Sequence, residues 1–257
     1  MSNTIIKQSC NSSEYSIGYC MVVSPAYLAG ALACVQSLRL ALDENRIHID
    51  LLGEIEALPS DFEALNCEII SHDSFASGDS AKNKGYTPLE YAVSIKSIFL
   101  QYINSFYSYD YLVYLDADLY FKRSLNDYLI NNCDLSQVLL TPHNLVGHIK
   151  ADLINSRSGV FNTGLVGFPR HHELLNWWSD RCSDFCFLEP EDGLFVDQKW
   201  LDQAVALFDK VTVCRDGRLN VGYWNVEERQ TILDDIICYH FSGLDIYSDG
   251  KRLSKYS

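Results

Sequence analysis

The sequence predicts an α/β domain in which helices cover a mostly parallel sheet. Short apolar runs suited to buried strands alternate with stretches whose apolar residues recur at helical spacing. Polar and acidic residues follow two of these runs directly, where the carboxyl ends of parallel strands offer a ligand-binding edge. A length of 257 residues suits one domain. We therefore expect a single domain over residues 1–257, with a loose polar arm at 1–15 and a tail at 244–257.

Short apolar runs predict the strands of this domain. The runs lie at residues 17–24, 47–52, 67–70, 111–121, 138–141, 160–168, 211–214 and 236–243. Two of them end at Pro25 and Pro169, which cannot continue a sheet ladder. The run at 160–168 is interrupted by Asn162 and Gly164, and glycine inside a strand often marks a bulge or a close approach of another part of the chain.

Helical spacing of apolar residues predicts the helices. They lie at residues 27–42, 88–103, 125–130, 172–186 and from the Asp197-Gln198 pair to 208, with a short acidic helix between the second and third strands. Residues 74–85 and 143–158 are predicted to be loops. The helix at 88–103 has the strongest start signal, because Thr87 suits the N-cap, Pro88 the first helical position and Glu90 a capping box.

Composition and charge narrow the functional classes. The formal net charge of −14 argues against a nucleic-acid-binding protein, since such proteins normally present a basic face. The sequence shows no targeting signal and no apolar run of about 18 residues, so we expect neither a signal peptide nor a membrane span. The nine cysteines include no paired CxxC units, which favours free thiols in a reducing compartment. We therefore expect a cytoplasmic location.

The central feature is the pair Asp116 and Asp118, at the end of the apolar run that starts at Tyr111. Side chains alternate along a strand, so two carboxylates one residue apart point to the same side and repel each other unless a cation or a proton lies between them. A hard divalent ion, Mg²⁺ or Mn²⁺, is the natural partner of such oxygen ligands. Alternatively, one carboxylate caps the next element and the other is solvated; the spacing alone leaves both interpretations open.

Five further positions carry polar groups that could belong to a site. Ser24 and Tyr27 follow the first strand, at the same kind of carboxyl edge, so the two strand ends could face one crevice. Lys96 is the only cation in its helix, and the pattern alone favours a side chain that snorkels to solvent. Asn162 is either a turn residue or a buried group that needs hydrogen-bond partners, and His240 is either a structural histidine or a ligand.

Four motifs follow one another in a recognisable order. They are Asp-x-Asp at 116–118, Phe-Asn-x-Gly at 161–164, Asp-Gln at 197–198 and His-Phe-x-Gly at 240–243. In this order they resemble the GT-A glycosyltransferases, most closely the glycogenin-like branch (family 8) and related bacterial polysaccharide transferases. The resemblance covers residues 18–245 and implies a GT-A (Rossmann-like) three-layer sandwich.

The resemblance implies a role for each matching residue. The residues that match metal ligands are Asp116, Asp118 and His240. The residues that match nucleotide contacts are Ser24, Tyr27, Lys96 and Asp116. The residues that match donor-sugar contacts are Asn162, Gly164, Asp197 and Gln198. Asp197 matches the position close to the anomeric centre, which makes it the predicted catalytic residue.

The implied activity is metal-dependent transfer of a hexose from a nucleotide-diphosphate sugar, a UDP-hexose with Mn²⁺ or Mg²⁺ as cofactor, to a hydroxyl of a glycan or lipid-linked acceptor. This branch implies a retaining outcome and a place in polysaccharide or lipopolysaccharide biosynthesis, with peripheral membrane association left open. The relatives carry a phosphate-binding lysine soon after His-Phe-x-Gly, whereas this chain has Leu-Asp-Ile-Tyr at 244–247. Either Lys251 or Lys255 takes that role, or the diphosphate is held differently.

Three other functions fit parts of the pattern. A phosphatase of the haloacid dehalogenase type carries Asp-x-Asp after its first strand, whereas three predicted strands precede the pair here. A nucleotidyltransferase would need a cationic, glycine-rich loop after the first strand, and residues 24–30 contain no cation. A catalytically inactive domain that binds a sugar nucleotide or a glycan is the remaining alternative, and the presence of every expected metal ligand argues against it.

Overall fold

The computed structural model describes residues 15–53, 61–76 and 84–244. The predicted N-terminal arm up to residue 14 and the predicted tail from residue 245, with Lys251 and Lys255, therefore lie outside the described residues.

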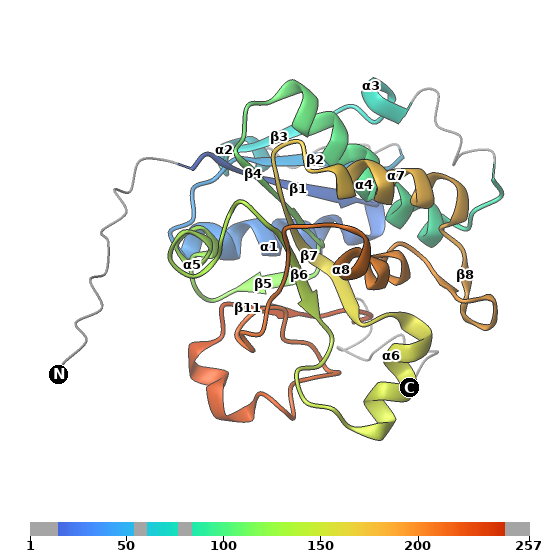
Figure 1. The fold of residues 1–257 in the computed structure, drawn as a ribbon. Helices are drawn as coiled ribbons and strands as arrows, with labels where there is room; N and C mark the ends of the chain where they lie inside the picture. The colour runs from blue at the N-terminus through green and yellow to red at the C-terminus, as the bar shows by residue number, and fades with distance from the viewer. Residues whose placement is uncertain (1–14, 54–60, 77–83, 245–257) are drawn as a thin grey trace.

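A seven-stranded sheet forms the centre of the described structure, in the order β10-β6-β7-β4-β1-β2-β3 (Figure 1). Its strands are β1 (Ile17–Val23), β2 (Ile47–Leu51), β3 (Cys67–Ile70), β4 (Tyr111–Leu115), β6 (Val138–Pro142), β7 (Phe161–Pro169) and β10 (Val211–Val213). The strands β3, β2, β1 and β4 run parallel to one another, and so do β6 and β10. Only β7 runs against its neighbours β4 and β6. This mostly parallel sheet confirms the predicted α/β class.

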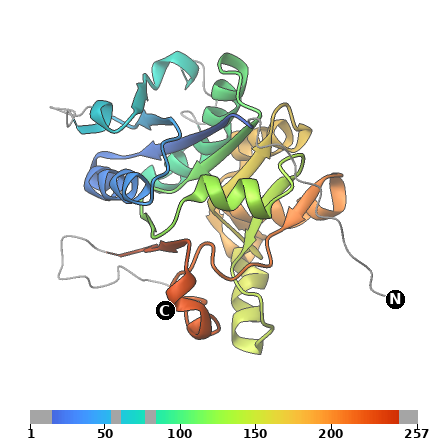
Figure 2. The ribbon, with the colours of Figure 1, turned by 90° about the vertical axis from the view of Figure 1, so that its left-hand side faces the viewer.

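Helices cover both faces of the sheet and create two apolar cores (Figures 1 and 2). Because side chains alternate along β1, Tyr19 and Met21 face one core, and Cys20 and Val22 face the other. The first core packs against α1 (Leu28–Leu40) and α5 (Leu125–Asn132). The second packs against α4 (Pro88–Phe106) and α7 (Glu173–Phe185). The result is the expected three-layer arrangement.

Two short antiparallel ribbons complete the strands. One pairs β5 (Leu119–Phe121) with β11 (Cys238–His240), and the other pairs β8 (Leu188–Glu189) with β9 (Leu194–Phe195). The first ribbon corrects the prediction of one strand over 111–121: the chain leaves the main sheet after Leu115, turns, and re-pairs from Leu119 with the last strand. In Figure 1 this ribbon lies below the main sheet.

The start of α4 confirms the capping prediction. The Thr87 side chain accepts a hydrogen bond from the Glu90 backbone N–H at 3.3 Å, and the Glu90 carboxylate accepts one from the Thr87 N–H at 2.7 Å. The interruption in β7 is also present as an irregularity in the pairing with β6, because Leu140 pairs with Val166 whereas the next residue, Thr141, pairs with Asn162.

The predicted loop over 143–158 was wrong in part, because α6 (Ile149–Ser158) occupies its second half. None of the residues of α6 is buried, and its large apolar side chains, Ile149, Leu153 and Ile154, are all exposed, so no packed apolar face defines this helix. Polar contacts hold the chain at and before its start: the His148 ring caps the Lys150 N–H at 3.3 Å, and the Glu228 carboxylate accepts hydrogen bonds from the Leu145 and Val146 N–H groups.

The remaining elements are short. They are η1 (Pro25–Tyr27), α2 (Asp61–Ala64), α3 (Asp73–Ala76), η3 (Pro190–Asp192), η4 (Gln198–Gln203), α8 (Ala204–Leu207) and η5 (Gln230–Asp235). The presence of α3 corrects the start of the loop predicted over 74–85. The eight cysteines among the described residues are free thiols. Within the described ranges, no helix combines the length and apolarity that crossing a bilayer requires.

Candidate functional site

The candidate site lies at the carboxyl edge of the sheet, where three segments meet. Because β1 and β4 are parallel neighbours, η1 and the Asp116–Asp118 turn leave the sheet side by side. The antiparallel β7 begins at the same edge, and its Gly164 carbonyl accepts a hydrogen bond from the Asp116 N–H at 2.8 Å. The predicted site residues after β1, after β4 and at the start of β7 therefore share one edge.

Asp116, Asp118 and His240 form a compact cluster of ligand atoms, all within 4.8 Å of one another. His240 Nε2 lies 3.0 Å from Asp118 Oδ1 and 3.6 Å from Asp116 Oδ2. The prediction that the two carboxylates point to the same side is confirmed, but a turn after β4 brings them together rather than alternation along a strand. The β5–β11 ribbon brings the cluster together, since β11 carries His240 and the Phe241 N–H donates to the Asp118 carbonyl at 2.9 Å.

The charges within this cluster favour a cation between its members. Burial is the largest single influence on Asp118 and His240 and opposes charge on both, but their mutual attraction and hydrogen bond, with other nearby groups, together outweigh it, so the pKa of Asp118 is lowered and the pKa of His240 is raised. A metal ion that replaces the imidazolium proton would be held by the same atoms. The side chains of Asp116 and Asp118 are 25% and 20% exposed, so the cluster is open to a ligand. Two carboxylates and one imidazole can together hold a divalent metal ion.

Lys96 points into the site, so the interpretation that it snorkels to solvent was wrong. Its Nζ lies 2.9 Å from Asp116 Oδ1, 3.6 Å from Asp197 Oδ2 and 4.9 Å from the centre of the Tyr114 ring. Burial lowers the pKa of Lys96, but the two carboxylates outweigh it and the net shift is upward, so the ammonium stays charged. Lys96 thus joins the carboxylate at the end of β4 to a second one at the start of η4.

That second carboxylate, Asp197, is 1% exposed and has an oxygen without a hydrogen-bond partner. Oδ2 is the orphaned atom, and its 3.6 Å separation from Lys96 Nζ is an ion-pair distance rather than a hydrogen bond. Burial raises the pKa of Asp197, and Lys96 offsets this only in part. Buried carboxylate oxygens are nearly always hydrogen-bonded, so this one indicates that a ligand completes the site.

Local backbone structure fixes the position of Asp197. The Trp178 indole N–H donates to the Asp197 carbonyl at 2.9 Å. The preceding residue, Val196, has a φ of +44°, which is strained for a β-branched side chain and costs on the order of 1–3 kcal/mol. Such strain persists where the surrounding structure enforces it, and here it aims the Asp197 side chain toward Lys96.

The predicted sugar-contact residues lie around Asp197, and some of their polar atoms already form hydrogen bonds within the protein. Asn162 Oδ1 accepts hydrogen bonds from the Gly164 N–H and from Asn220 Nδ2, both at 2.9 Å, and its amide nitrogen contacts His143 Nε2 at 3.5 Å, which leaves one of its two N–H groups for a ligand. Gln198 Nε2 donates to the Ser158 carbonyl at 2.7 Å, which leaves its amide oxygen. These contacts satisfy the expectation that a buried Asn162 needs partners. The sugar-contact roles themselves stay predictions.

Ser24 and Tyr27 lie at the more open side of the same edge. Tyr27 is 41% exposed and precedes the first residue of α1. The first turn of α1 packs on the Asp116–Asp118 turn, since a Cβ on Gly30 would lie 3.1 Å from the Ala117 carbonyl oxygen. A nucleotide held at the two aspartates would therefore have this segment beside it.

Three contributors to the site carry no motif that the sequence analysis assigned. Asn220 hydrogen-bonds His240 Nδ1 at 2.8 Å, Trp178 holds the Asp197 backbone, and Thr163 hydrogen-bonds the Asp197 side chain. The one sequence signal for Asn220 is a polar residue between apolar neighbours, in Leu219-Asn220-Val221.

Gly164→Ala should weaken metal binding about 10- to 100-fold and lower stability by about 1–3 kcal/mol. A Cβ at this position would lie 2.3 Å from His240 Cε1 and 2.8 Å from His240 Nδ1, so the ring must move. Titration of the protein with Mn²⁺, with free Mn²⁺ followed by electron paramagnetic resonance, measures the effect. Gly147→Ala is the control, because a Cβ there meets nothing within 4 Å. Equal Mn²⁺ affinity in both variants would remove His240 from the site.

Comparisons with known proteins agree with this architecture. No family model matches the chain. A curated relative, the uncharacterized protein YfnF of Bacillus subtilis (strain 168), is 32% identical over 177 residues. The match covers 62% of this chain and spans 58% of that relative's length.

Solved structures of glycosyltransferases share the fold. The galactosyltransferase LgtC, solved with donor and acceptor sugar analogues, has a TM-score of 0.57 and 17% identity, over 88% of this chain and 87% of LgtC. Mouse xyloside xylosyltransferase 1 has a TM-score of 0.51 and 17% identity, over 87% of this chain and 97% of that one. The bifunctional glycosyltransferase WbbM has a TM-score of 0.57 and 13% identity, over 90% of this chain and 46% of WbbM. The predicted GT-A fold is confirmed.

Proposed function

We propose that this chain, which has the fold of the glycosyltransferases just described, is a metal-dependent glycosyltransferase that moves a hexose from a UDP-sugar to a hydroxyl of a glycan or lipid-linked acceptor. One observation carries the proposal: Asp116, Asp118 and His240 converge at the carboxyl edge of the sheet, with Lys96 and the orphaned Asp197 carboxylate beside them. The arrangement offers a place for a cation, and Lys96 links it to the Asp197 carboxylate, whose Oδ2 lacks a hydrogen-bond partner.

The residues of the cluster fit a bound divalent ion, Mn²⁺ or Mg²⁺. Asp116, Asp118 and His240 would hold it, and when bound it would supply Lewis-acid stabilisation of the negative charge on the departing diphosphate. Lys96 holds Asp116 by the 2.9 Å ion pair and keeps a permanent positive charge near the same region. The charge of Lys96 also limits the repulsion between Asp116 and Asp197, which would otherwise both be anions at close range.

Asp197 is the residue that we assign to the donor sugar and to the reacting centre. Its orphaned Oδ2 would accept a hydrogen bond from a sugar hydroxyl, and its negative charge would favour positive charge at the anomeric carbon. Asn162 would donate through its amide nitrogen and Gln198 would accept through its amide oxygen. Gly164 keeps this region free of a side chain next to His240. The family resemblance favours transfer with retention of configuration.

The rest of the proposal concerns the ends of the substrate. Ser24 and Tyr27 would lie against the base, and Lys251 or Lys255 stays the proposed phosphate contact. We propose a single catalytic domain in the cytoplasm that acts in polysaccharide or lipopolysaccharide assembly, with an acceptor that enters from the solvent side of the two aspartates. The acidic balance of the chain supports a nucleotide held through a cation rather than through a basic surface.

A donor screen tests the proposal. The full chain is incubated with UDP-, GDP- and dTDP-sugars, each with and without Mn²⁺, and thermal shift identifies the donor that stabilises it; hydrolysis of that donor is then measured. We expect one UDP-hexose to raise the Tm only with Mn²⁺ and to be turned over slowly without acceptor. Stabilisation without turnover, also with a panel of acceptor glycans, would support an inactive binding domain instead. No stabilisation by any sugar nucleotide would contradict the proposal.

A further inference from the structure

We propose that Asn220 is a positioning residue that fixes which ring nitrogen of His240 faces the two aspartates. The inference rests on the proposed metal site. Among the described residues, Asn220 hydrogen-bonds neither Asp116 nor Asp118, and it reaches the proposed metal site through the His240 ring. Asn220 is 1% exposed, and its amide contacts join the start of β7 to the end of β11.

The hydrogen bonds of Asn162 establish the direction of the network. The Gly164 backbone N–H can only donate, and it donates to Asn162 Oδ1 at 2.9 Å. On the other side, the Gly159 carbonyl can only accept, and it lies 3.0 Å from His143 Nδ1. His143 is therefore protonated on Nδ1, and its Nε2 accepts from the Asn162 amide nitrogen at 3.5 Å. Two backbone groups thus require the same orientation of the Asn162 amide.

That orientation passes to Asn220. Its Nδ2 lies 2.9 Å from Asn162 Oδ1 and 2.8 Å from Thr141 Oγ1, so the nitrogen donates to both. Thr141 is free to accept, because its own hydroxyl proton lies toward the carbonyls of Asn162 and Leu165. A reversed Asn220 amide would place its oxygen against Asn162 Oδ1, an acceptor facing an acceptor at hydrogen-bond distance. The Asn220 oxygen must therefore face His240.

The orientation of Asn220 then decides the state of His240. Asn220 Oδ1 lies 2.8 Å from His240 Nδ1 and can only accept, so Nδ1 carries a proton. Nε2 therefore faces Asp118 at 3.0 Å, where it donates while the ring is an imidazolium and carries the lone pair that a metal needs once the ring loses that proton. Outer-sphere acceptors of this kind orient histidine ligands and raise their basicity. The Gly164 backbone N–H in β7 thus fixes the Asn162 amide, which fixes the Asn220 amide, and this in turn decides which nitrogen of His240 in β11 faces the metal site.

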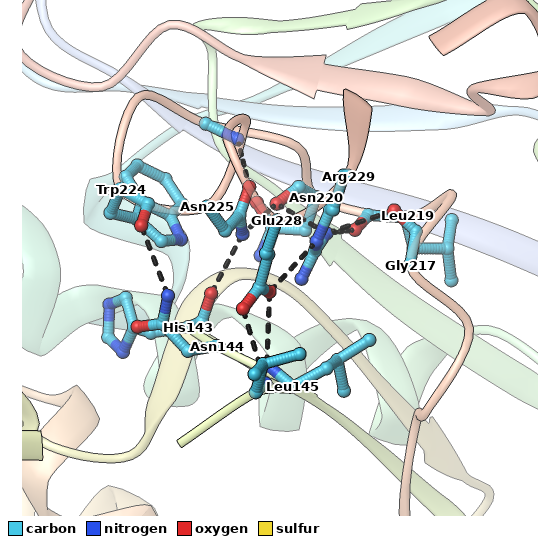
Figure 3. Close-up of polar contacts among 12 residues, drawn as sticks. His143, Asn144, Leu145, Gly217, Leu219, Asn220, Trp224, Asn225, Glu228 and Arg229 are labelled. Carbon is cyan, nitrogen blue, oxygen red and sulfur yellow. Dashed lines mark hydrogen bonds and ion pairs between the residues drawn. The ribbon is translucent and has the colours of Figure 1, made fainter. Parts of the chain in front are cut away.

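The loop that carries Asn220 is held rigidly, as a positioning role requires (Figure 3). Asn220 has a φ of +55°, a conformation that asparagine tolerates better than most residues. The buried Arg229 side chain donates to the carbonyls of Gly217, Leu219 and Asn220. Asn225 donates to the carbonyls of His143 and Asn220, at 2.8 and 3.3 Å. Figure 3 shows these side chains converging on the loop from both sides.

Two substitutions of Asn220 distinguish a role in positioning His240 from a role in folding alone. Asn220→Gly keeps the left-handed backbone conformation and removes the whole amide. Asn220→Asp keeps an oxygen that accepts from His240 Nδ1. The control is Asn144→Ala, which loses hydrogen bonds to the Trp224 carbonyl and from Asn155 in the same network but none to His240. Each full-length variant is titrated with Mn²⁺ alone, and the protonation of the His240 ring nitrogens is read from ¹⁵N chemical shifts at a pH where the ring is neutral.

We expect Asn220→Gly to bind Mn²⁺ about 10- to 100-fold more weakly and to show a mixture of His240 tautomers. Asn220→Asp should retain the Nδ1-protonated tautomer, and Asn144→Ala should retain both the tautomer and the Mn²⁺ affinity. Wild-type affinity and a single tautomer in Asn220→Gly would overturn the positioning role while leaving the metal site intact. Failure of the wild-type chain to bind Mn²⁺ would overturn the metal site itself, and with it this proposal.

Discussion

Asp118→Asn should lower metal-dependent turnover of the sugar nucleotide on the order of 100- to 1000-fold, with a Tm close to that of the wild type. The substitution removes an anionic ligand from a set of three, so the cation that stabilises the diphosphate would be held poorly. The fold should tolerate it, because the new amide can donate to neutral His240 Nε2, which now lies 3.0 Å from Asp118.

Donor hydrolysis at several Mn²⁺ concentrations, together with a thermal melt, measures both effects. Asp127→Asn is a matched control, since this acidic residue lies in the first turn of α5, where it belongs to no ligand cluster. A large drop in Tm for Asp118→Asn would show that the carboxylate is structural. Full activity at ordinary Mn²⁺ concentrations would exclude Asp118 from the metal site.

Asp197→Ala should lower kcat about 100- to 1000-fold and raise the KM for the donor much less. In the proposed mechanism, the negative charge of Asp197 stabilises positive charge that develops only as the glycosidic bond breaks, so its loss affects the transition state more than the bound donor. Stability should change little. Burial raises the pKa of Asp197, so the ionised carboxylate opposes folding, and Lys96 keeps its 2.9 Å ion pair with Asp116.

Steady-state kinetics of donor turnover test this division between kcat and KM. Asp202→Asn serves as the control, because Asp202 lies in the same segment but pairs with Lys199 and with the Val160 N–H. A change confined to KM would reduce Asp197 to a binding contact. An unchanged kcat would exclude it from the reaction.

The fold was predictable because its signals are local. The alternation of strands and helices follows from apolar periodicity, and the start of α4 follows from Thr87, Pro88 and Glu90 within one turn. The exposed helix α6 was missed because it packs on no core: Ile149, Leu153 and Ile154 stay exposed among polar neighbours, so the stretch resembles a loop. The break after Leu115 was missed because β4 and β5 are both apolar, and only pairing with the distant β11 separates them.

The site was predictable only where a motif marks it. Asp116, Asp118 and His240 were identified together through the resemblance, and the structure brings their ligand atoms within 4.8 Å. Lys96 illustrates the limit of pattern alone: one cation on an amphipathic helix usually reaches water, and its burial depends on Asp116 and Asp197 from two other elements. The role of Asn220 depends on hydrogen-bond directions that run through Asn162 to His240, which no sequence spacing contains.

The strained backbone conformation of Val196 was likewise not predictable from the sequence. Valine is a poor choice for a φ of +44°, and nothing in the local sequence predicts this conformation. The tertiary contacts that impose it, among them the hydrogen bond from Val196 N–H to the Phe187 carbonyl at 3.0 Å, involve a segment nine residues away. Functional sites are where such disagreements between local preference and tertiary structure are expected.

The central claim is that Asp116, Asp118 and His240 hold a nucleotide diphosphate through a divalent cation. Calorimetric titration of the full chain with UDP, in the presence of Mn²⁺ and again in the presence of a chelator, tests this most directly. We predict that UDP binds with Mn²⁺, that the chelator abolishes binding, and that His240→Ala weakens it even with Mn²⁺. Binding of UDP that is equally strong with the chelator, or no binding of UDP under either condition, would contradict the claim.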